Sequence, residues 1–210
     1  AREPQYLKVM PAILAETDLF FCNLEEARVL VGTKYGNDNG IADVIDADLD
    51  HDGTGKGNDR GTEFAVEAAS LARALVKCQN RMGSRAVVHF DTGAVAAWAS
   101  EYADKKNVVT YYQRAWAVPP ERVAGTNGAG DAFAAGFLLG LFRGLGCGGS
   151  LRLGCASAAM CVTEATPSGA LGPVASALQF VENLARPVWG SKDSLAARAA
   201  VLRHRLSTVD

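Results

Sequence analysis

The alternation of apolar and polar positions predicts helices and short strands in turn from the start of the chain. Apolar residues recur at helical spacing over residues 6–14, and residues 17–22 form a short apolar run typical of a buried strand. Residues 23–31 predict a helix with Asn23 as its cap and an apolar stripe that includes Leu30. Arg28 falls outside that stripe, so we expect it to face solvent.

The composition and the spacing of apolar residues change twice in the middle of the chain. Residues 32–61 are rich in Gly, Asp and Asn and predict a solvated insertion loop. Residues 62–79 then predict a helix, for which Thr62 is a candidate cap. Its apolar stripe at helical spacing consists of Phe64, Ala68, Leu71, Leu75 and Cys78. Three short β-rich runs follow and predict strands at residues 85–90, 94–99 and 108–112.

Small and apolar residues dominate the last part of the chain. A helix is predicted over residues 129–143, and a second one over 149–163 contains so many Ala and Ser residues that it requires close packing. Two more helices are predicted at 174–184 and 194–206, the last of them basic and solvated. Strands that alternate with helices predict the α/β class, with a mostly parallel sheet flanked by helices.

Composition narrows the class of protein. A chain of 210 residues with 49% hydrophobic residues suits one domain with a sizeable core, here residues 1–210. A net charge of −2 gives no reason to expect nucleic acid, and the apolar runs are too short to span a bilayer. Five cysteines without C-x-x-C spacing indicate reduced thiols and a cytoplasmic location, and three scattered histidines suggest no metal cluster.

The stretch with the clearest chemistry is G-T-N-G-A-G-D-A-F, residues 125–133. Unpaired N–H groups and the helix dipole at the start of the following helix form an anion site. Asp131 would repel a bound phosphate, but it can take a proton from a hydroxyl that attacks phosphorus. The alternative is an acidic residue placed there only for the dipole. Neither this stretch nor residues 52–57 matches a Rossmann fingerprint or a Walker A loop.

G-T-N-G-A-G-D-A-F-A-A-G-F closely resembles the C-terminal signature of the ribokinase-like (phosphofructokinase-B type) carbohydrate kinases. Residues 18–27, D-L-F-F-C-N-L-E-E-A, resemble the family's strand that ends in N-x-x-E, with Asn23 and Glu26 in the motif positions. The resemblance implies a ribokinase-like fold in which Asp131 is the catalytic base. It also implies an anion hole built by the backbone of Gly128, Ala129 and Gly130.

The same resemblance implies ATP and Mg²⁺ as cofactors. Glu26, helped by Asn23, would organise the magnesium ion through its bound waters, which suits an ion that keeps several waters and needs few carboxylates. Thr126, Ser157 and Gly169 fall at positions near the nucleotide. The implied acceptor is a small sugar or nucleoside-like alcohol, and a homodimer is a candidate assembly.

The chain departs from the family pattern at three places. It begins only one helix before the N-x-x-E strand, so we expect the N-terminal portion and lid, with most sugar-binding residues, to be missing, as in a fragment of a longer protein. His89-Phe90-Asp91 stands where the family has T-x-G, which weakens the nucleotide contacts implied there. Gly125 stands where many members carry an Asp that helps bind potassium.

The leading function is therefore ATP-dependent phosphorylation of a sugar or sugar-like alcohol. The alternative is a non-catalytic nucleotide-binding remnant or a truncated fragment without the substrate half. A third hypothesis is a calcium-regulated module, because residues 48–59 match a calcium loop at its first acidic positions and its glycine. That loop has Asp59 where a bidentate Glu belongs, so a merely acidic loop is the competing interpretation.

Overall fold

The computed structural model describes residues 5–32, 44–46, 60–79, 81–99 and 108–166, and the single positions 176 and 179. The chain divides into two compact units. The first unit comprises Ala1–Ala47 with Thr54–Tyr112, and the second comprises Asp48–Gly53 with Gln113–Asp210.

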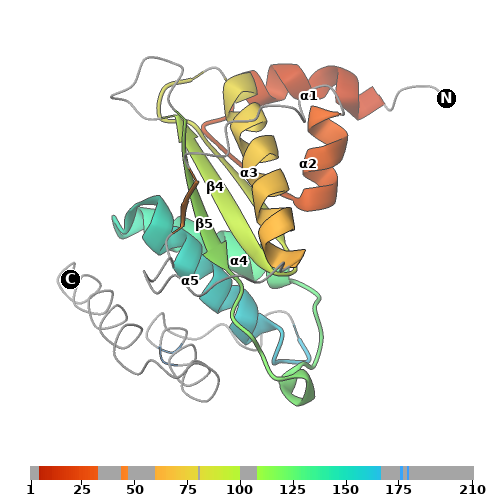
Figure 1. Ribbon diagram of the computed structural model, residues 1–210, viewed down its shortest axis with the longest axis vertical. Helices are drawn as coiled ribbons and strands as arrows, with labels where there is room; N and C mark the ends of the chain where they lie inside the picture. Colours follow the sequence, from red (N-terminus) through yellow and green to blue (C-terminus); the bar gives the residue numbers. More distant parts are fainter. Residues whose placement is uncertain are drawn as a thin grey trace. The chain divides into compact units, whose positions relative to one another are not determined.

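The first unit is a sheet with helices packed on it, as the α/β prediction required (Figure 1). Every strand except β2 follows a predicted apolar run closely, and the first helix contains Pro11. The last two residues of β5 already belong to the second unit. The elements in chain order are α1 Gln5–Ala15, β1 Leu19–Asn23, α2 Leu24–Val31, β2 Val44–Asp46, α3 Arg60–Gln79, β3 Arg85–Phe90, β4 Gly93–Ala99 and β5 Val108–Arg114.

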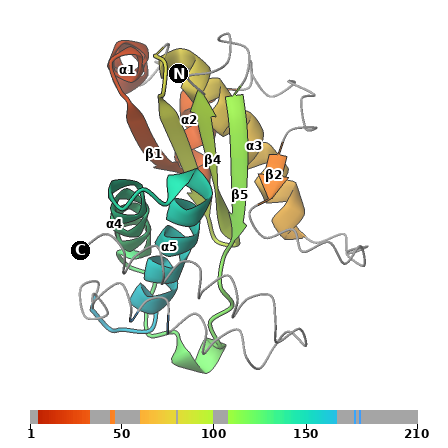
Figure 2. The same ribbon diagram turned by 90° about the vertical axis from the view of Figure 1, so that its left-hand side faces the viewer.

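The sheet has the strand order β1-β3-β4-β5-β2 and is mixed rather than mostly parallel. β1 pairs with β3 in parallel, from Leu19 opposite Arg85, and β2 pairs with β5 in parallel. β3 and β4 are antiparallel, and Figure 2 shows β4 between β1 and β5 in the sheet. Only Asp91 and Thr92 connect them, and a connection that short allows a hairpin but no parallel crossover. The expectation of a mostly parallel sheet was therefore wrong at this central pair.

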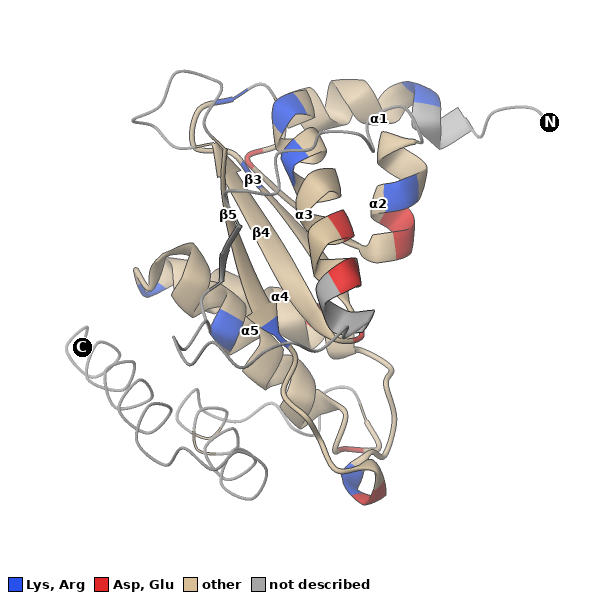
Figure 3. Ribbon diagram, in the orientation of Figure 1, with Lys and Arg blue, Asp and Glu red and all other residues tan. Residues whose placement is uncertain are grey.

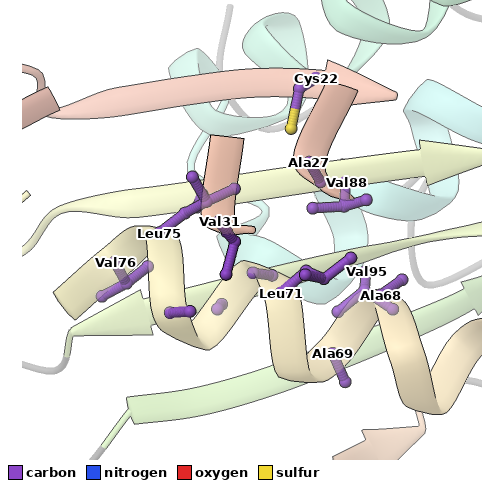
Figure 4. Close-up of a cluster of buried hydrophobic side chains, with 14 of the residues drawn as sticks. Cys22, Ala27, Val31, Ala68, Ala69, Leu71, Leu75, Val76, Val88 and Val95 are labelled. Carbon is purple, nitrogen blue, oxygen red and sulfur yellow. The ribbon is translucent and has the colours of Figure 1, made fainter. Parts of the chain in front are cut away.

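The core of the first unit lies between the sheet and α3. Ala68, Leu71 and Leu75 of α3 are buried and belong to one cluster with Val88 of β3 and Val95 of β4 (Figure 4). The predicted stripe is confirmed at these three positions. The helix begins at Arg60, so Thr62 is not its cap. The stripe's outer members, Phe64 and Cys78, are exposed because they lie near the two ends of the helix.

The insertion predicted at residues 32–61 contains a strand. β2 lies inside it and pairs with β5, with Val44 opposite Thr110. A solvated loop alone was therefore the wrong expectation for residues 44–46, whose short apolar run supplies an edge strand. The possible calcium loop at 48–59 lies outside the described residues. The predicted helices at 174–184 and 194–206 do too, except that positions 176 and 179 are helical.

The second unit is built around a pair of closely packed helices, α4 Ala129–Phe142 and α5 Gly146–Cys161, preceded by a short 3₁₀ helix at Pro120–Arg122. A Cβ atom added to Gly136 would lie 2.8 Å from the carbonyl oxygen of Leu153. One added to Gly140 would lie 2.7 Å from the Cα atom of Ser150. The two helices therefore pack with their backbones in near contact, which confirms the close packing predicted for α5.

Candidate functional site

Residues 124–130, the signature loop, turn sharply into α4. Gly128 is the N-cap residue of α4 and has φ 79° and ψ 0°, a left-handed conformation. Glycine adopts such a φ at little cost because it has no Cβ atom. Gly128 has no side chain with which to cap this end of α4, so the N–H groups of its first turn depend on other acceptors. That arrangement suits an anion-binding helix start.

The backbone donors of the loop are not equivalent. The N–H of Ala132 donates to the carbonyl of Gly128 at 2.8 Å, and the N–H of Ala129 donates to the carbonyl of Thr126 at 3.2 Å. Among the described residues, the N–H groups of Gly128, Gly130 and Asp131 donate to no backbone carbonyl. Gly128 and Gly130 are therefore free to receive an anion, whereas Ala129 already has an acceptor. The sequence motif alone did not show this difference.

Asp131 lies in the first turn of α4 and is exposed. Within the described part of the chain, its carboxylate forms no hydrogen bond and no ion pair. A carboxylate that is to accept a proton from a substrate must be accessible and uncommitted to another donor. The local geometry of Asp131 meets both requirements.

Residues at the end of α5 and just after it form hydrogen bonds with the signature loop. The carbonyl of Val162 accepts hydrogen bonds from the N–H groups of Ala124, at 2.8 Å, and Gly125, at 3.3 Å. The thiol of Cys161 donates to the carbonyl of Asn127, with 3.7 Å between Sγ and the oxygen. Sequence reasoning missed this support because α5 follows the loop by a full helix and no local motif marks the contact.

Cys161 is almost fully buried, with 1% of its surface exposed. Burial raises the pKa of the Cys161 thiol, and the negative charge of Asp131 raises it further. The thiol is consequently protonated at neutral pH and remains a hydrogen-bond donor.

In the first unit, Asn23 and Glu26 close the start of α2. The N–H of Glu26 donates to Asn23 Oδ1 at 2.8 Å, and the N–H of Asn23 donates to Glu26 Oε2 at 2.9 Å. These reciprocal bonds form a capping box, which confirms the predicted cap at Asn23. Burial raises the pKa of the neighbouring Cys22 to about 12, and the charge of Glu26 adds to this shift.

The Asn23–Glu26 pair fits a water-mediated magnesium site. The carboxylate of Glu26 has about four lone-pair positions, and the capping bond occupies one of them. No group of three or more His, Cys, Asp or Glu side chains arranged to hold a metal is found in the part of the chain that the structure describes. A site with one carboxylate and several waters is what Mg²⁺ usually accepts.

Arg28 faces solvent only in part: its side chain is 36% exposed, and it also contacts two carboxylates. Its Nε and Nη2 atoms donate to Glu67 Oε1 and Oε2, both at 2.7 Å, and its Nη1 atom contacts Glu25. This two-bond pair, the Arg28–Glu67 fork, links α2 to α3, and the colours in Figure 3 mark where acidic and basic residues lie along the two helices. The hydrogen bonds from Arg28 lower the pKa of Glu67, although burial opposes the shift. The partner lies on another helix, so the local pattern gave no sign of it.

Thr126, Ser157 and Gly169 are the other predicted nucleotide contacts, and the structure describes the first two. Thr126 is exposed in the signature loop. Ser157 lies in the helix pair, because a Cβ atom added to Gly136 would clash with its side chain. This position agrees with a packing role, and a nucleotide contact for Ser157 stays a prediction. Gly169 lies outside the described residues.

A family model, described as pfkB family carbohydrate kinase, matches residues 1–171. The chain belongs to the pfkB family. The motifs around Asn23 and Asp131 predicted this family from the sequence, and the family match confirms that prediction. No curated protein matches the chain.

Among solved structures, this pfkB-family chain is similar to an adenosine kinase from Schistosoma mansoni in complex with 2-fluoroadenosine. The sequence identity is 19% and the TM-score is 0.49. The match covers 81% of this chain but only 41% of the length of the adenosine kinase. Among the described residues, no helix combines the length and apolar character needed to cross a membrane.

Proposed function

We propose that this chain carries the phosphoryl-transfer machinery of an ATP-dependent kinase that phosphorylates a hydroxyl group of a sugar or sugar-like alcohol. Membership of the pfkB family supports the kinase class and ATP as co-substrate. The observation that carries the proposal is the start of α4. There the exposed carboxylate of Asp131 adjoins the N–H groups of Gly128 and Gly130, and none of these three groups has a partner among the described residues.

In the proposed reaction, the carboxylate of Asp131 accepts the proton of the acceptor hydroxyl while the hydroxyl oxygen attacks the γ-phosphorus of ATP. The bond from the γ-phosphorus to the bridging oxygen breaks, and ADP leaves with the electron pair. The N–H groups of Gly128 and Gly130 and the dipole of α4 stabilise charge on the transferred phosphoryl group. Ala129 joins them only when its bond to Thr126 opens.

Magnesium, when bound, would neutralise part of the negative charge of the nucleotide phosphates. Glu26 is the residue proposed to hold its water molecules, and the capping box with Asn23 fixes the position of the carboxylate. Thr126, Ser157 and Gly169 are proposed as nucleotide contacts on the family pattern. A nucleoside-like acceptor, a homodimer, a cytoplasmic location and a substrate-binding portion outside this chain stay predictions.

The test is Asp131→Asn in the full-length protein, which removes the base but keeps the size of the side chain. We expect kcat to fall about 10²–10⁴-fold. The Kd for ATP, measured by calorimetry, is expected to change little. Glu121→Gln is the matched control, because it removes an exposed acidic residue of the same unit outside the signature loop. An Asp131→Asn enzyme with wild-type turnover would show that another group is the base.

A non-catalytic, nucleotide-binding role is the second candidate. It is favoured by the structural roles of two residues named from the family pattern: Glu26 closes the capping box of α2, and Ser157 packs against α4. This candidate predicts ATP binding without turnover of the full-length protein across a panel of sugars and nucleosides. The third hypothesis, a calcium-regulated module, concerns residues outside the described part of the chain.

A further inference from the structure

The last residue of α5 contacts the signature loop at the point where the loop turns into α4. We propose that Cys161 is a positioning residue that sets the orientation of the anion-binding backbone at Gly128. The inference rests on the proposed phosphoryl-transfer function. It assigns a role to a side chain that lies outside both family motifs.

The contact acts through a single peptide group. The Cys161 thiol donates to the carbonyl oxygen of Asn127. That carbonyl and the N–H of Gly128 belong to the same planar trans peptide, so they point in opposite directions and rotate together. A bond that fixes the carbonyl of Asn127 therefore also fixes the direction of the Gly128 N–H, one of the free donors of the loop.

The rest of the support comes from the backbone at the same helix end. The final carbonyls of a helix lack intrahelical partners, and here the carbonyl of Val162 is satisfied by the N–H groups of Ala124 and Gly125. The backbone thus anchors the loop up to Gly125, and the thiol of Cys161 anchors it at Asn127. Of these three contacts, only the one from Cys161 is made by a side chain, so a substitution can remove it selectively.

The electrostatic surroundings keep the thiol in its donating form. Cys161 is buried, and the charge of Asp131 disfavours a thiolate. A thiolate would also repel the carbonyl oxygen of Asn127. A hydrogen bond from S–H to a carbonyl is weak, but here it acts on a loop whose donors must be aligned with a developing charge.

The competing interpretation is that Cys161 only fills space between α5 and the loop. Both interpretations predict that Cys161→Ala lowers the melting temperature, because a buried sulfur is lost. They differ in the kinetics and in the effect of Cys161→Ser, which restores a donor in place of the thiol. Cys147→Ala is the matched control, since it removes a buried thiol from the opposite end of the same helix.

In the full-length enzyme, we expect Cys161→Ala to lower kcat about tenfold, because small displacements of reacting groups cost rate steeply. The KM for ATP should stay within about twofold, since the loss falls on the transition state. Cys161→Ser should recover most of kcat, and Cys147→Ala should keep the wild-type kcat. Wild-type kcat in Cys161→Ala, or equally low kcat in the Ala and Ser variants, would overturn the proposal.

A second measurement separates this inference from the proposed function. The NMR order parameter of the Gly128 N–H should fall in Cys161→Ala, but not in Cys147→Ala, because loss of the bond to Asn127 frees the shared peptide group to rotate. An unchanged order parameter would refute the positioning role whether or not the protein is a kinase. If the order parameter falls as expected but the wild-type protein phosphorylates no acceptor, the kinase proposal fails and the loop contact stands.

Discussion

The amide oxygen of Asn23 accepts from the backbone N–H of Glu26, and the carboxylate of Glu26 accepts from the backbone N–H of Asn23. The two residues that mark the N-x-x-E motif thus also close the start of α2. A substitution at either position therefore combines an effect on folding with any effect on a bound magnesium ion. The two effects can be separated by choosing side chains that keep the cap but lose the charge.

Glu26→Gln and Glu26→Ala should behave differently in stability but alike in magnesium dependence. Glutamine also forms a capping box, so we expect the free energy of unfolding to change by less than about 0.5 kcal/mol. Alanine should cost about 1 kcal/mol. Both variants should need more magnesium for half-maximal turnover. Urea unfolding and a magnesium titration measure these quantities, and an unchanged titration in Glu26→Gln would leave Glu26 as a cap only.

The fork between Arg28 and Glu67 should make stability depend on pH at the acid end. The pKa of Glu67 is lowered in the folded chain, so its contribution is present above the unfolded pKa, about 4.3, and is lost as pH falls through the folded value. The wild-type melting temperature should therefore fall more steeply on acidification than that of Glu67→Gln.

The side chains of this pair are 36% and 39% exposed, so the effect should also shrink at high salt. Glu63→Gln is the matched control, because it removes an exposed carboxylate from the first turn of the same helix. Parallel acid profiles for the wild type and Glu67→Gln would contradict a stabilising role for the fork.

The contact between α4 and α5 should not tolerate a methyl group at Gly136. A Cβ atom there would meet the side chain of Ser157 and lie 2.8 Å from the carbonyl oxygen of Leu153. We expect Gly136→Ala to cost about 1–3 kcal/mol by overpacking, despite the better helix propensity of alanine. Adding Ser157→Ala should recover only part of this loss, since the Leu153 carbonyl remains. Leu138→Ala, on the exposed face of α4, is the control for substitution in that helix.

Local patterns in the sequence were enough to predict most elements of the fold. The cap at Asn23 was predictable because a capping box lies within four consecutive residues. The partner of Arg28 was not, because Glu67 lies on a separate helix and only the packing of α2 on α3 brings the two together. The short connection at Asp91 was enough to predict the antiparallel pairing of β3 and β4. The alternation of strands and helices favoured parallel pairing instead.

In the candidate site, too, some features were predictable from the local sequence and others depended on packing. The glycine pattern predicted the turn at Gly128 and the place of Asp131 in the first turn of α4, both of which depend on neighbours in sequence. The hydrogen bond of Ala129 to Thr126 depends on the path of the loop, which composition does not determine. The contact of Cys161 with Asn127 joins residues 34 positions apart and required the packing of α5.

The last prediction concerns potassium. Many members of the family resembled here carry, at the position of Gly125, an Asp that helps bind this ion. Hard cations favour charged oxygen ligands, and glycine offers none. We therefore expect the kcat/KM of the full-length enzyme to depend little on potassium. The structure shows that the missing side chain has room, because a Cβ atom at Gly125 would have no neighbour within 4 Å and φ is not positive there.

Gly125→Asp should consequently fold normally and gain activation by potassium. Its backbone N–H can still donate to Val162, so the anchoring of the loop is kept. The measurement is kcat/KM in sodium-free buffer with and without potassium at fixed ionic strength. Gly125→Asn is the control, since it has a similar shape but no charge and should show no activation. Strong activation of the wild type would mean that another oxygen ligand binds the ion in place of the aspartate. Without activation in Gly125→Asp, a carboxylate at this position would be insufficient to build a cation site in this chain.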